Sequence, residues 1–201
     1  MDEISLMHTA QAGDLDAFNQ IVLAYQEMVY NLACRMLSDP AAAEDATQNA
    51  FIAAFRNIRS YRGGSCKAWL LRIATNLCYD EVRRRKRRPV TALEPYDPDS
   101  DEEIESPAWL ADGHPSPEEA LEQVELDAAI QHCLDELPHE FRLVVVMVDI
   151  EGCNYQEVSE TIGKPIGTVK SRMARARLKL KDCLKHVWEL LPVGFRLESE
   201  A

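Results

Sequence analysis

The segment 155–180 contains three residues whose types and spacing suit a helix-turn-helix. Such a motif needs a small residue where the second helix crosses the first, and a glycine with positive φ in the turn four residues later. It also needs an apolar anchor in the second helix. Ser159, Gly163 and Val169 meet these requirements. Because Pro165 is tolerated in a first helical turn, we predict a recognition helix that begins near Pro165 and runs past Leu180.

One face of this predicted helix carries side chains that can read DNA bases. With 3.6 residues per turn, the residues that share this face are Lys170, Ser171, Ala174 and Arg175. Arginine can bond guanine through two hydrogen bonds in the major groove, and serine or lysine can assist. The residues placed for phosphate contacts are Thr168, Arg172 and Arg177. The opposite stripe, expected to be buried, consists of Val169, Met173, Ala176 and Leu180. A basic, solvated surface helix is the simpler alternative, but the turn residues and the groove face agree in one register.

Basic charge is gathered in two blocks along the chain. Residues 56–88 hold eleven Lys and Arg against two acids, and residues 164–185 hold eight against one. Taken alone, the net charge of −12 argues against a nucleic-acid partner, because neutralising phosphates requires clustered cations. The acids are concentrated in residues 91–127, which carry thirteen Asp and Glu and no Lys or Arg. The sequence therefore predicts two basic surfaces joined by an acidic segment.

Apolar spacing predicts three helices in the first half of the chain. Residues 18–36 have apolar side chains every three or four positions, and the next helix begins at Ser38-Asp39-Pro40, where Ser or Asp can cap it. Its expected apolar stripe is Phe51, Ile52 and Phe55. After an exposed loop at residues 60–66, a third helix buries one side and ends near Pro89. The buried side consists of Trp69, Leu70, Ile73 and Leu77. Trp69 could stack on a base, but its place in this stripe favours the core.

The second half is predicted to be helical as well. Residues 91–115 contain four prolines among acids and too few apolar residues to order, so we expect a flexible linker. Ser116 and Glu119 form a capping box that starts the next helix. The valines of residues 141–150 would suit a strand by propensity, but the helical neighbours favour a helix. The expected fold class is all-α, with two small helical domains joined by an acidic flexible linker, the second containing the helix-turn-helix.

Several classes of protein are disfavoured by the sequence. The five histidines are scattered, and neither a glycine-rich phosphate loop nor a spaced nucleophile and base is visible. We therefore expect no enzyme, no cofactor and no metal site. The six cysteines lack a CxxC motif and are expected to be reduced thiols, mostly in the core. The first residues lack a basic, then apolar, leader and no long apolar run occurs, so we expect a cytoplasmic protein without membrane insertion.

Three ordered motifs resemble those of extracytoplasmic-function sigma factors of the sigma-70 family. They are AEDATQNAF in the second predicted helix, YRGGSCKAWLLRIATNLCYDEVRRRKRR in the centre and YQEVSETIGKPIGTVKSRMARARLKL near the C-terminus. The similarity covers residues 10–90 and about 117–185. It implies a region 2 domain at 1–90, a linker at 91–115, a region 4 domain at 116–188 and a tail at 189–201. The family directs bacterial core RNA polymerase to promoters and melts the DNA there.

The resemblance also implies roles for individual residues. Contacts with the clamp helices of the largest polymerase subunit are expected from Glu44, Asp45, Gln48 and Phe51. The motif departs from the family pattern at Ala46 and Asn49, and Phe51 suits core packing equally well. A flipped base of the −10 element is expected to be held by Ser65, Arg72, Asn76 and Asp80, with Arg83 and Arg84 on the backbone. The helix-turn-helix is then expected to read the −35 element.

The expected partners are therefore core RNA polymerase, promoter DNA and, by resemblance, an anti-sigma factor that covers the polymerase-binding surfaces. A conventional helix-turn-helix regulator, acting without core polymerase, is the main alternative. It explains residues 139–185 but leaves the helix around AEDATQNAF and the basic central helix without a role.

Overall fold

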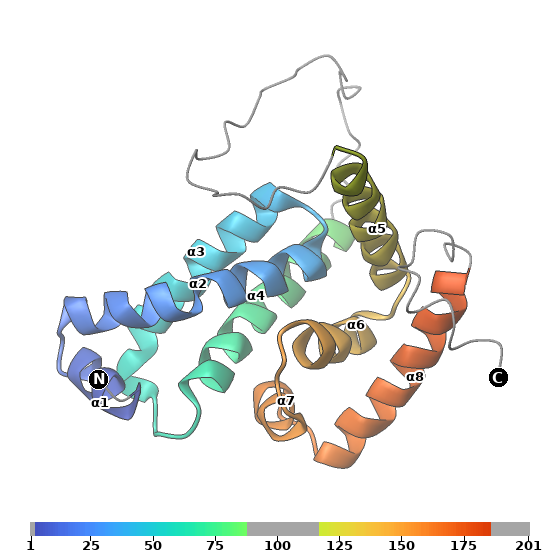
Figure 1. Cartoon of the computed structure of the whole chain (residues 1–201). Coiled ribbons are helices and arrows are strands. Elements are labelled where there is room, and N and C mark those ends of the chain that lie inside the picture. The colour runs from blue at the N-terminus through green and yellow to red at the C-terminus, as the bar shows by residue number, and fades with distance from the viewer. Residues whose placement is uncertain (1–2, 88–116, 186–201) are drawn as a thin grey trace.

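The helices form two groups, and the first group consists of the helices within residues 3–87 (Figure 1). The computed structural model describes residues 3–87 and 117–185, and the side chains of the latter part from residue 124 onward. The elements of this first group are α1 (Glu3–Gln11), α2 (Leu15–Leu37), α3 (Pro40–Asn57), the 3-10 turn η1 (Ile58–Ser60) and α4 (Cys66–Arg87). Helix α2 packs against α1, α3 and α4, so it forms the centre of this group.

The second group follows after residue 116. It consists of α5 (Pro117–Asp135), α6 (His139–Val145), the π-helical turn η2 (Val146–Ile150), α7 (Tyr155–Ile162) and α8 (Ile166–Leu184). All regular elements among residues 3–87 and 117–185 are helical, which confirms the all-α fold class. The valine-rich segment is helical as predicted, although its second half widens into a π turn. The expected linker and the cap at Ser116 lie outside the described residues, and the domain boundaries stay a prediction.

Local sequence signals set the helix ends. Asp39 caps α3, because its carboxylate accepts a hydrogen bond of 3.1 Å from the backbone N–H of Ala42, and Pro40 is the first helical residue. The preceding helix ends at Ser38, whose left-handed backbone (φ 56°) reverses the chain. The predicted turn at residues 38–40 is therefore confirmed.

The predicted apolar stripe of α3 is only partly correct. Phe51 is buried, but Ile52 is 47% exposed and Phe55 is 41% exposed. The face that α3 turns towards its neighbours is instead lined by small residues, Ala43, Ala46, Ala50 and Ala54. Phe55 still contacts the ring of Phe18 edge-on, with the centroids 5.1 Å apart. Close packing through alanine thus replaces the expected aromatic seam.

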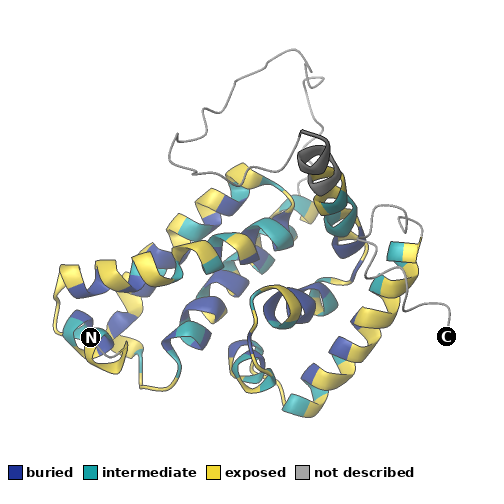
Figure 2. Ribbon diagram, in the orientation of Figure 1, coloured by how far each residue is buried: buried dark blue, intermediate teal, exposed yellow. Residues whose placement is uncertain are grey.

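The two groups pack directly against each other. Figure 2 shows buried residues along α4 and α6, where the groups face one another. Helix α7 lies on the first half of α4, and the Thr161 hydroxyl donates to the Ala68 carbonyl over 3.3 Å. Lys67 lies 3.9 Å from Glu157 at the same contact. The buried apolar side chains of both groups form one continuous cluster.

Arg142 in α6 is the one charged residue that is buried within the described part of the chain, at 5% exposure. Its guanidinium donates to the Met36 carbonyl over 3.2 Å and to the Asp135 carbonyl over 2.7 Å. The Asp135 carboxylate lies 2.8 Å away. Since Met36 is in the last turn of α2, the cation also faces the negative end of the helix dipole. Arg142 therefore joins α2, α5 and α6.

Polar side chains surround this buried guanidinium at the end of α2. Gln131 of α5 accepts from the Arg35 guanidinium over 3.2 Å and donates to the Ser38 hydroxyl over 3.0 Å. The Ser38 hydroxyl donates to the Asp135 carboxylate. Helix α5 is thereby held against the C-terminal end of α2, as the arrangement in Figure 1 shows.

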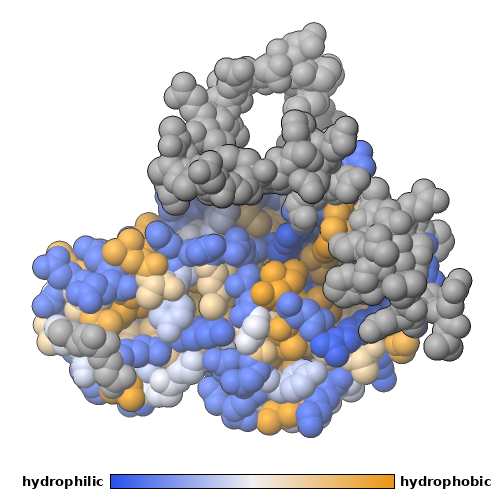
Figure 3. All heavy atoms as spheres, in the orientation of Figure 1, coloured by the Kyte–Doolittle hydropathy of each residue, from blue (hydrophilic) through white to orange (hydrophobic). Residues whose placement is uncertain are grey.

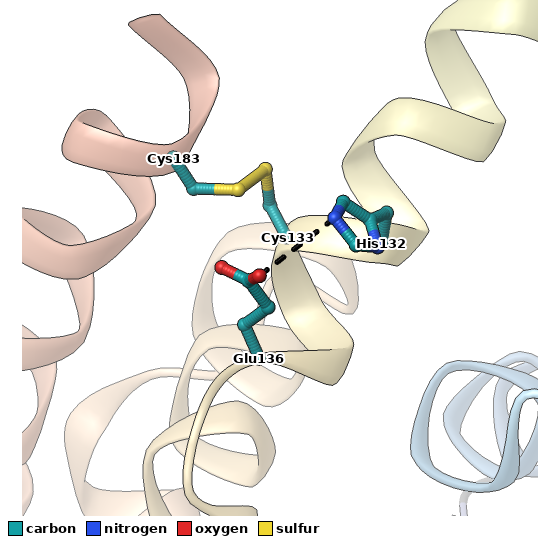
Figure 4. The surroundings of a disulfide bond; sticks show 4 residues. All are labelled: His132, Cys133, Glu136 and Cys183. Carbon is teal, nitrogen blue, oxygen red and sulfur yellow. Dashed lines mark ion pairs between the residues drawn. A yellow bond between two sulfur atoms is a disulfide. The ribbon is translucent and has the colours of Figure 1, made fainter. Parts of the chain in front are cut away.

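The prediction that all six cysteines are reduced thiols is wrong for two of them. Cys133 of α5 and Cys183 of α8 form a disulfide, with their Cα atoms 5.7 Å apart (Figure 4). The pair is separated by 50 residues and lies on two helices, so no local spacing in the sequence indicates it. The other four cysteines, Cys34, Cys66, Cys78 and Cys153, are free. Among the described helices, none has the length and apolar character required to cross a bilayer.

Replacing Arg142 by Met tests the joint between the groups. We expect the free energy of unfolding to fall by about 3 kcal/mol, because the substitution leaves the partners of a buried cation without their donor. Urea denaturation followed by circular dichroism measures the change. Arg83→Met is the matched control, since that side chain is 67% exposed and its ion pair with Asp80, at 3.4 Å, lies within α4, and it should cost less than about 1 kcal/mol. Equal losses in the two variants would contradict a special role for Arg142.

Candidate nucleic-acid interface

The turn between α7 and α8 has the geometry that the sequence predicts. Gly163 has a φ of 63°, a left-handed conformation that residues with a Cβ atom rarely adopt. Ser159 closes the turn, since its carbonyl accepts from the Gly163 N–H and its hydroxyl donates to the Lys164 carbonyl over 2.6 Å. At the other end of α7, Asn154 and Glu157 form a reciprocal capping box, which sequence reasoning missed.

Helix α8 has one buried stripe and one exposed face. Val169, Met173 and Ala176 are at most 2% exposed, which confirms most of the predicted stripe, while Leu180 is half-buried. The helix begins at Ile166, one residue after Pro165, and continues beyond Leu180 as predicted. The predicted base-reading residues Lys170, Ser171, Ala174 and Arg175 are all exposed. Leu178, which sequence reasoning did not single out, lies on the same side with 65% exposure. The face proposed for the major groove is therefore accessible.

The predicted phosphate contacts on α8 are engaged within the protein. Arg177 binds both oxygens of Asp149, at 2.6 and 3.2 Å. Arg172 forms an ion pair with Glu140 on α6. By the helical spacing, the two arginines lie on opposite edges of the exposed face. Thr168 is half-buried, and its carbonyl accepts a hydrogen bond from the Ser171 hydroxyl.

Helix α4 presents the predicted −10 residues as a single stripe. Arg72, Asn76, Asp80 and Arg83 are exposed at intervals of three or four residues, so they lie on one side of the helix. Ser65 lies at the N-terminal end of α4, where its hydroxyl accepts from the Ala68 N–H over 3.1 Å. This serine thus caps the helix, which is a structural role in addition to the predicted one.

The basic block at the end of α4 divides into outward and inward arginines. Arg84 donates two hydrogen bonds to Glu81, at 2.7 and 2.8 Å, and is exposed. Arg85 bonds Glu81 on one side and reaches 2.7 Å to Asp39, the cap of α3. Hydrogen bonds from Arg84 and then Arg85 lower the pKa of Glu81 to about 2. Arg85 therefore anchors α4 to the α2–α3 turn, a role that the run of basic letters could not distinguish from DNA binding.

The predicted polymerase contacts lie on α3. Glu44, Asp45 and Gln48 are exposed, whereas Phe51 is only 8% exposed and packs in the core. A groove of about 420 Å³ between α2 and α3 is lined by Gln26, Glu27, Tyr30, Glu44, Thr47 and Gln48. On the other side of α3, a second groove of about 370 Å³ is lined by Ala42, Asp45, Ala46, Asn49, Leu77, Asp80, Glu81 and Arg84. The second groove brings predicted polymerase and DNA contacts together.

The surface between these sites is mixed in character. On the face shown in Figure 3, hydrophobic residues form several separate patches between hydrophilic ones. Within the described ranges, no three His, Cys, Asp or Glu side chains lie close enough together to hold a metal ion. The chemistry that this arrangement supports is recognition through exposed cations and polar groups on α4 and α8.

Comparisons with known proteins match both groups of helices. The sequence fits the family descriptions Sigma-70 region 2 over residues 21–88 and Sigma-70 region 4 over residues 127–180. Two solved structures resemble the whole fold. CnrH, in complex with the cytosolic domain of CnrY, has a TM-score of 0.68 at 23% identity and covers 92% of this chain and 97% of its own. The sigma factor RpoE of Bartonella quintana, in complex with the anti-sigma factor NepR, has a TM-score of 0.61 at 26% identity and covers 84% and 96%.

Curated relatives are similar over most of the sequence. The ECF RNA polymerase sigma factor SigE of Mycolicibacterium smegmatis is 40% identical over 89% of this chain, which spans 66% of that protein. SigW of Bacillus subtilis is 37% identical over 86% of this chain and 91% of its own length. The RNA polymerase sigma-H factor of Pseudomonas aeruginosa is 33% identical over 90% and 92%. These matches confirm the resemblance seen in the three motifs, and the chain belongs to the ECF sigma factors of the sigma-70 family, which are not enzymes.

Proposed function

We propose that the protein binds bacterial core RNA polymerase and directs it to promoters, where α8 reads the −35 element and α4 holds the −10 element. The observation that carries this proposal is the exposed face of α8. There a left-handed turn at Gly163 aims a helix whose outward side chains are Lys170, Ser171, Ala174 and Arg175. A helix of this kind fits the width of the major groove. The cytoplasm, which contains bacterial DNA and polymerase, is the proposed place of action.

The acids that pair with Arg172 and Arg177 support this assignment. Arg177 is 55% exposed and Arg172 is 18% exposed in these pairs. The exposed Arg177 pair is of the surface type that contributes about 0–1 kcal/mol, so phosphate oxygens can replace the Asp149 carboxylate at little cost, whereas Arg172 is too little exposed for this magnitude to apply. Until DNA binds, Glu140 and Asp149 hold the two guanidinium groups at the edges of the groove-facing surface. The same reasoning applies to Arg84 and Glu81 on α4.

The stripe on α4 suits capture of a base from the −10 element. Flipping a base out of the stack costs a few kcal/mol, which contacts with the base edge must offset. Arg72 and Asn76 supply several hydrogen-bond donors, and Asp80 and Asn76 supply acceptors. All three side chains are exposed on the same side of α4. Core polymerase is proposed to bind next to them, at Glu44, Asp45 and Gln48, while the buried position of Phe51 favours core packing over contact.

The proposed function requires the two helical groups to separate. The −35 and −10 elements lie roughly 25 base pairs apart, or about 85 Å at 3.4 Å per base pair. A folded chain of this length has a radius of gyration of about 17 Å and cannot reach both elements while its halves are packed together. We infer that polymerase and DNA binding replace the contacts between α4 and α7 and those around Arg142. An anti-sigma factor, as in the solved complex of RpoE with NepR, is the proposed partner that competes for these surfaces.

The direct test uses purified protein and core polymerase that lacks any sigma factor. We expect co-elution in gel filtration and discrete transcripts from a pool of genomic promoters. Gln48→Ala should weaken co-elution. The matched change Gln20→Ala, at an exposed position in the N-terminal half of α2, should not. Arg175→Ala should cost about 1–3 kcal/mol of promoter binding and relax one position of the −35 preference. Specific duplex binding in the absence of core polymerase, with no transcripts in its presence, would favour a conventional regulator.

Asp149→Asn is predicted to strengthen duplex binding. Losing this carboxylate frees Arg177 for phosphate and removes a negative charge near the DNA. The slope of log K against log salt should become steeper by about one unit, as expected for one more phosphate contact. Titration of a labelled −35 duplex with holoenzyme at several salt concentrations measures this slope. Glu160→Gln removes an equal charge from α7, so an identical change in both variants would show a general charge effect instead.

Separation of the groups can be followed by energy transfer. Dyes attached through unnatural amino acids at Gln20 and Lys181 lie on different groups, and both positions are exposed. We expect high transfer in the free protein and a large decrease when core polymerase is added, because the groups must move apart to span the promoter. An unchanged efficiency in a transcribing complex would contradict the required separation.

A further inference from the structure

The disulfide between Cys133 and Cys183 has no part in the proposed reading of DNA. It joins α5, the helix that contacts α2, to the last turn of α8, the proposed recognition helix. Figure 4 shows the two sulfur atoms bridging these helices, with the His132–Glu136 pair beside them. The bond therefore connects the contact between the helical groups with the DNA-reading element.

The two cysteines of the disulfide differ in exposure. Cys133 is 1% exposed, whereas Cys183 is half-buried. An open cavity of about 630 Å³ leads to them, lined by His132, Cys133, Glu136, Leu137, Lys179, Asp182 and Cys183. We expect a small thiol to enter this cavity and to reach Cys183, the more exposed of the two residues, before Cys133. Because the lining carries both signs of charge, it suits a zwitterionic amino-acid thiol.

The free cysteines are poorer candidates for redox chemistry. Burial raises the pKa of Cys66 and of Cys78 to about 12, so both thiols are protonated at neutral pH. Burial also raises the pKa of Cys153. The thiolate is the reactive form in exchange, so these three positions react slowly. Among the cysteines that are buried, exchange is thus directed to the pair that already forms the disulfide, and the half-buried free thiol of Cys34 is tested separately by substitution.

We propose that Cys133 and Cys183 form a reversible redox site that exchanges with low-molecular-weight thiols and disulfides. In reduction, a small thiolate attacks the Cys183 sulfur, a mixed disulfide forms, and Cys133 leaves as a thiolate that takes up a proton. A second small thiol attacks the mixed disulfide and releases Cys183. Overall, two small thiols give two electrons and two protons to the protein and leave as one small disulfide. Oxidation by a small disulfide is the reverse.

The redox state of this pair determines whether α5 stays with α8 or with α2 when the two helical groups separate. In the oxidised protein the bond fixes α5 to α8, so separation of the helical groups must break the contacts of Arg35 and Ser38 with Gln131 and Asp135. In the reduced protein α5 is held on both sides by non-covalent contacts alone and can stay with α2. The bond also restricts the unfolded chain across 50 residues, which stabilises the second group. This effect on opening depends on the proposed function, whereas the exchange chemistry does not.

The test begins with the full-length protein in anaerobic buffers of reduced and oxidised glutathione at varied ratios. After acid quenching, alkylation under denaturing conditions and mass spectrometry report each cysteine. We expect Cys133 and Cys183 to titrate together as a two-electron couple, while Cys66 and Cys78 stay alkylated throughout. The oxidised protein should melt at least about 5 °C above the reduced protein. Independent titration of the two cysteines, or no disulfide in the most oxidising buffer, would overturn the proposal.

Two variants separate the disulfide from other effects of oxidation. Cys183→Ser should abolish the difference in melting temperature and should melt like reduced wild-type protein. Cys34→Ser, which removes a free half-buried thiol of the first group, should keep the full difference. A difference that persists in Cys183→Ser would refute this site. Binding of core polymerase is measured in both redox states, and its absence in both would refute the proposed function while the melting and alkylation results still judge the redox site.

Discussion

A guanidinium group that is almost completely removed from water lies where the two halves of this protein meet. Transferring an isolated charge into the interior is very costly, so Arg142 requires partners for its charged group. Its two terminal nitrogens find them in the last turn of α2 and in Asp135 at the end of α5, whereas its Nε has no hydrogen-bond partner among the described residues. The end of α2, the α5–α6 turn and α6 must therefore lie together. Because α6 packs on α8, the position of the proposed recognition helix relative to α2 follows from this joint.

Local features of the sequence were sufficient to predict most of the helices, although not α1, and the turn of the helix-turn-helix. The apolar spacing of α2, the cap at Asp39 and the glycine at position 163 each act within a few residues of chain. The positions that failed depend on distant neighbours. Ile52 and Phe55 are apolar at helical spacing, yet α3 packs through alanines instead. The candidate site residues of the first group were selected by resemblance and those on α8 by helical spacing, and the sequence alone could not show that Arg177 meets Asp149.

Individual ion pairs between arginines and acids determine the local charge of the exposed faces more than the net charge of the chain does. A net charge of −12 would repel DNA if it were evenly spread. In the structure, single acids instead hold the arginines next to the exposed faces, as Glu81 holds Arg84 and Asp149 holds Arg177. Such pairs limit the conformations of long side chains before a ligand arrives. In the proposed complex with DNA, phosphates take the places of these acids, and an acidic chain can in this way present local basic surfaces.

The contacts between the halves explain how one chain can be both compact and able to span a promoter. They consist of one buried cation, a few hydrogen bonds and a continuous apolar cluster. A buried ion pair adds little net stability over an apolar equivalent, because desolvation offsets most of the attraction. It does, however, specify one arrangement, since few other packings would satisfy Arg142. A closed state that polymerase and DNA are to open must have one defined packing but only modest stability. The disulfide adds a covalent link between α5 and α8, on one side of the joint. Opening then requires the polar contacts on the other side, between α5 and the end of α2, to break.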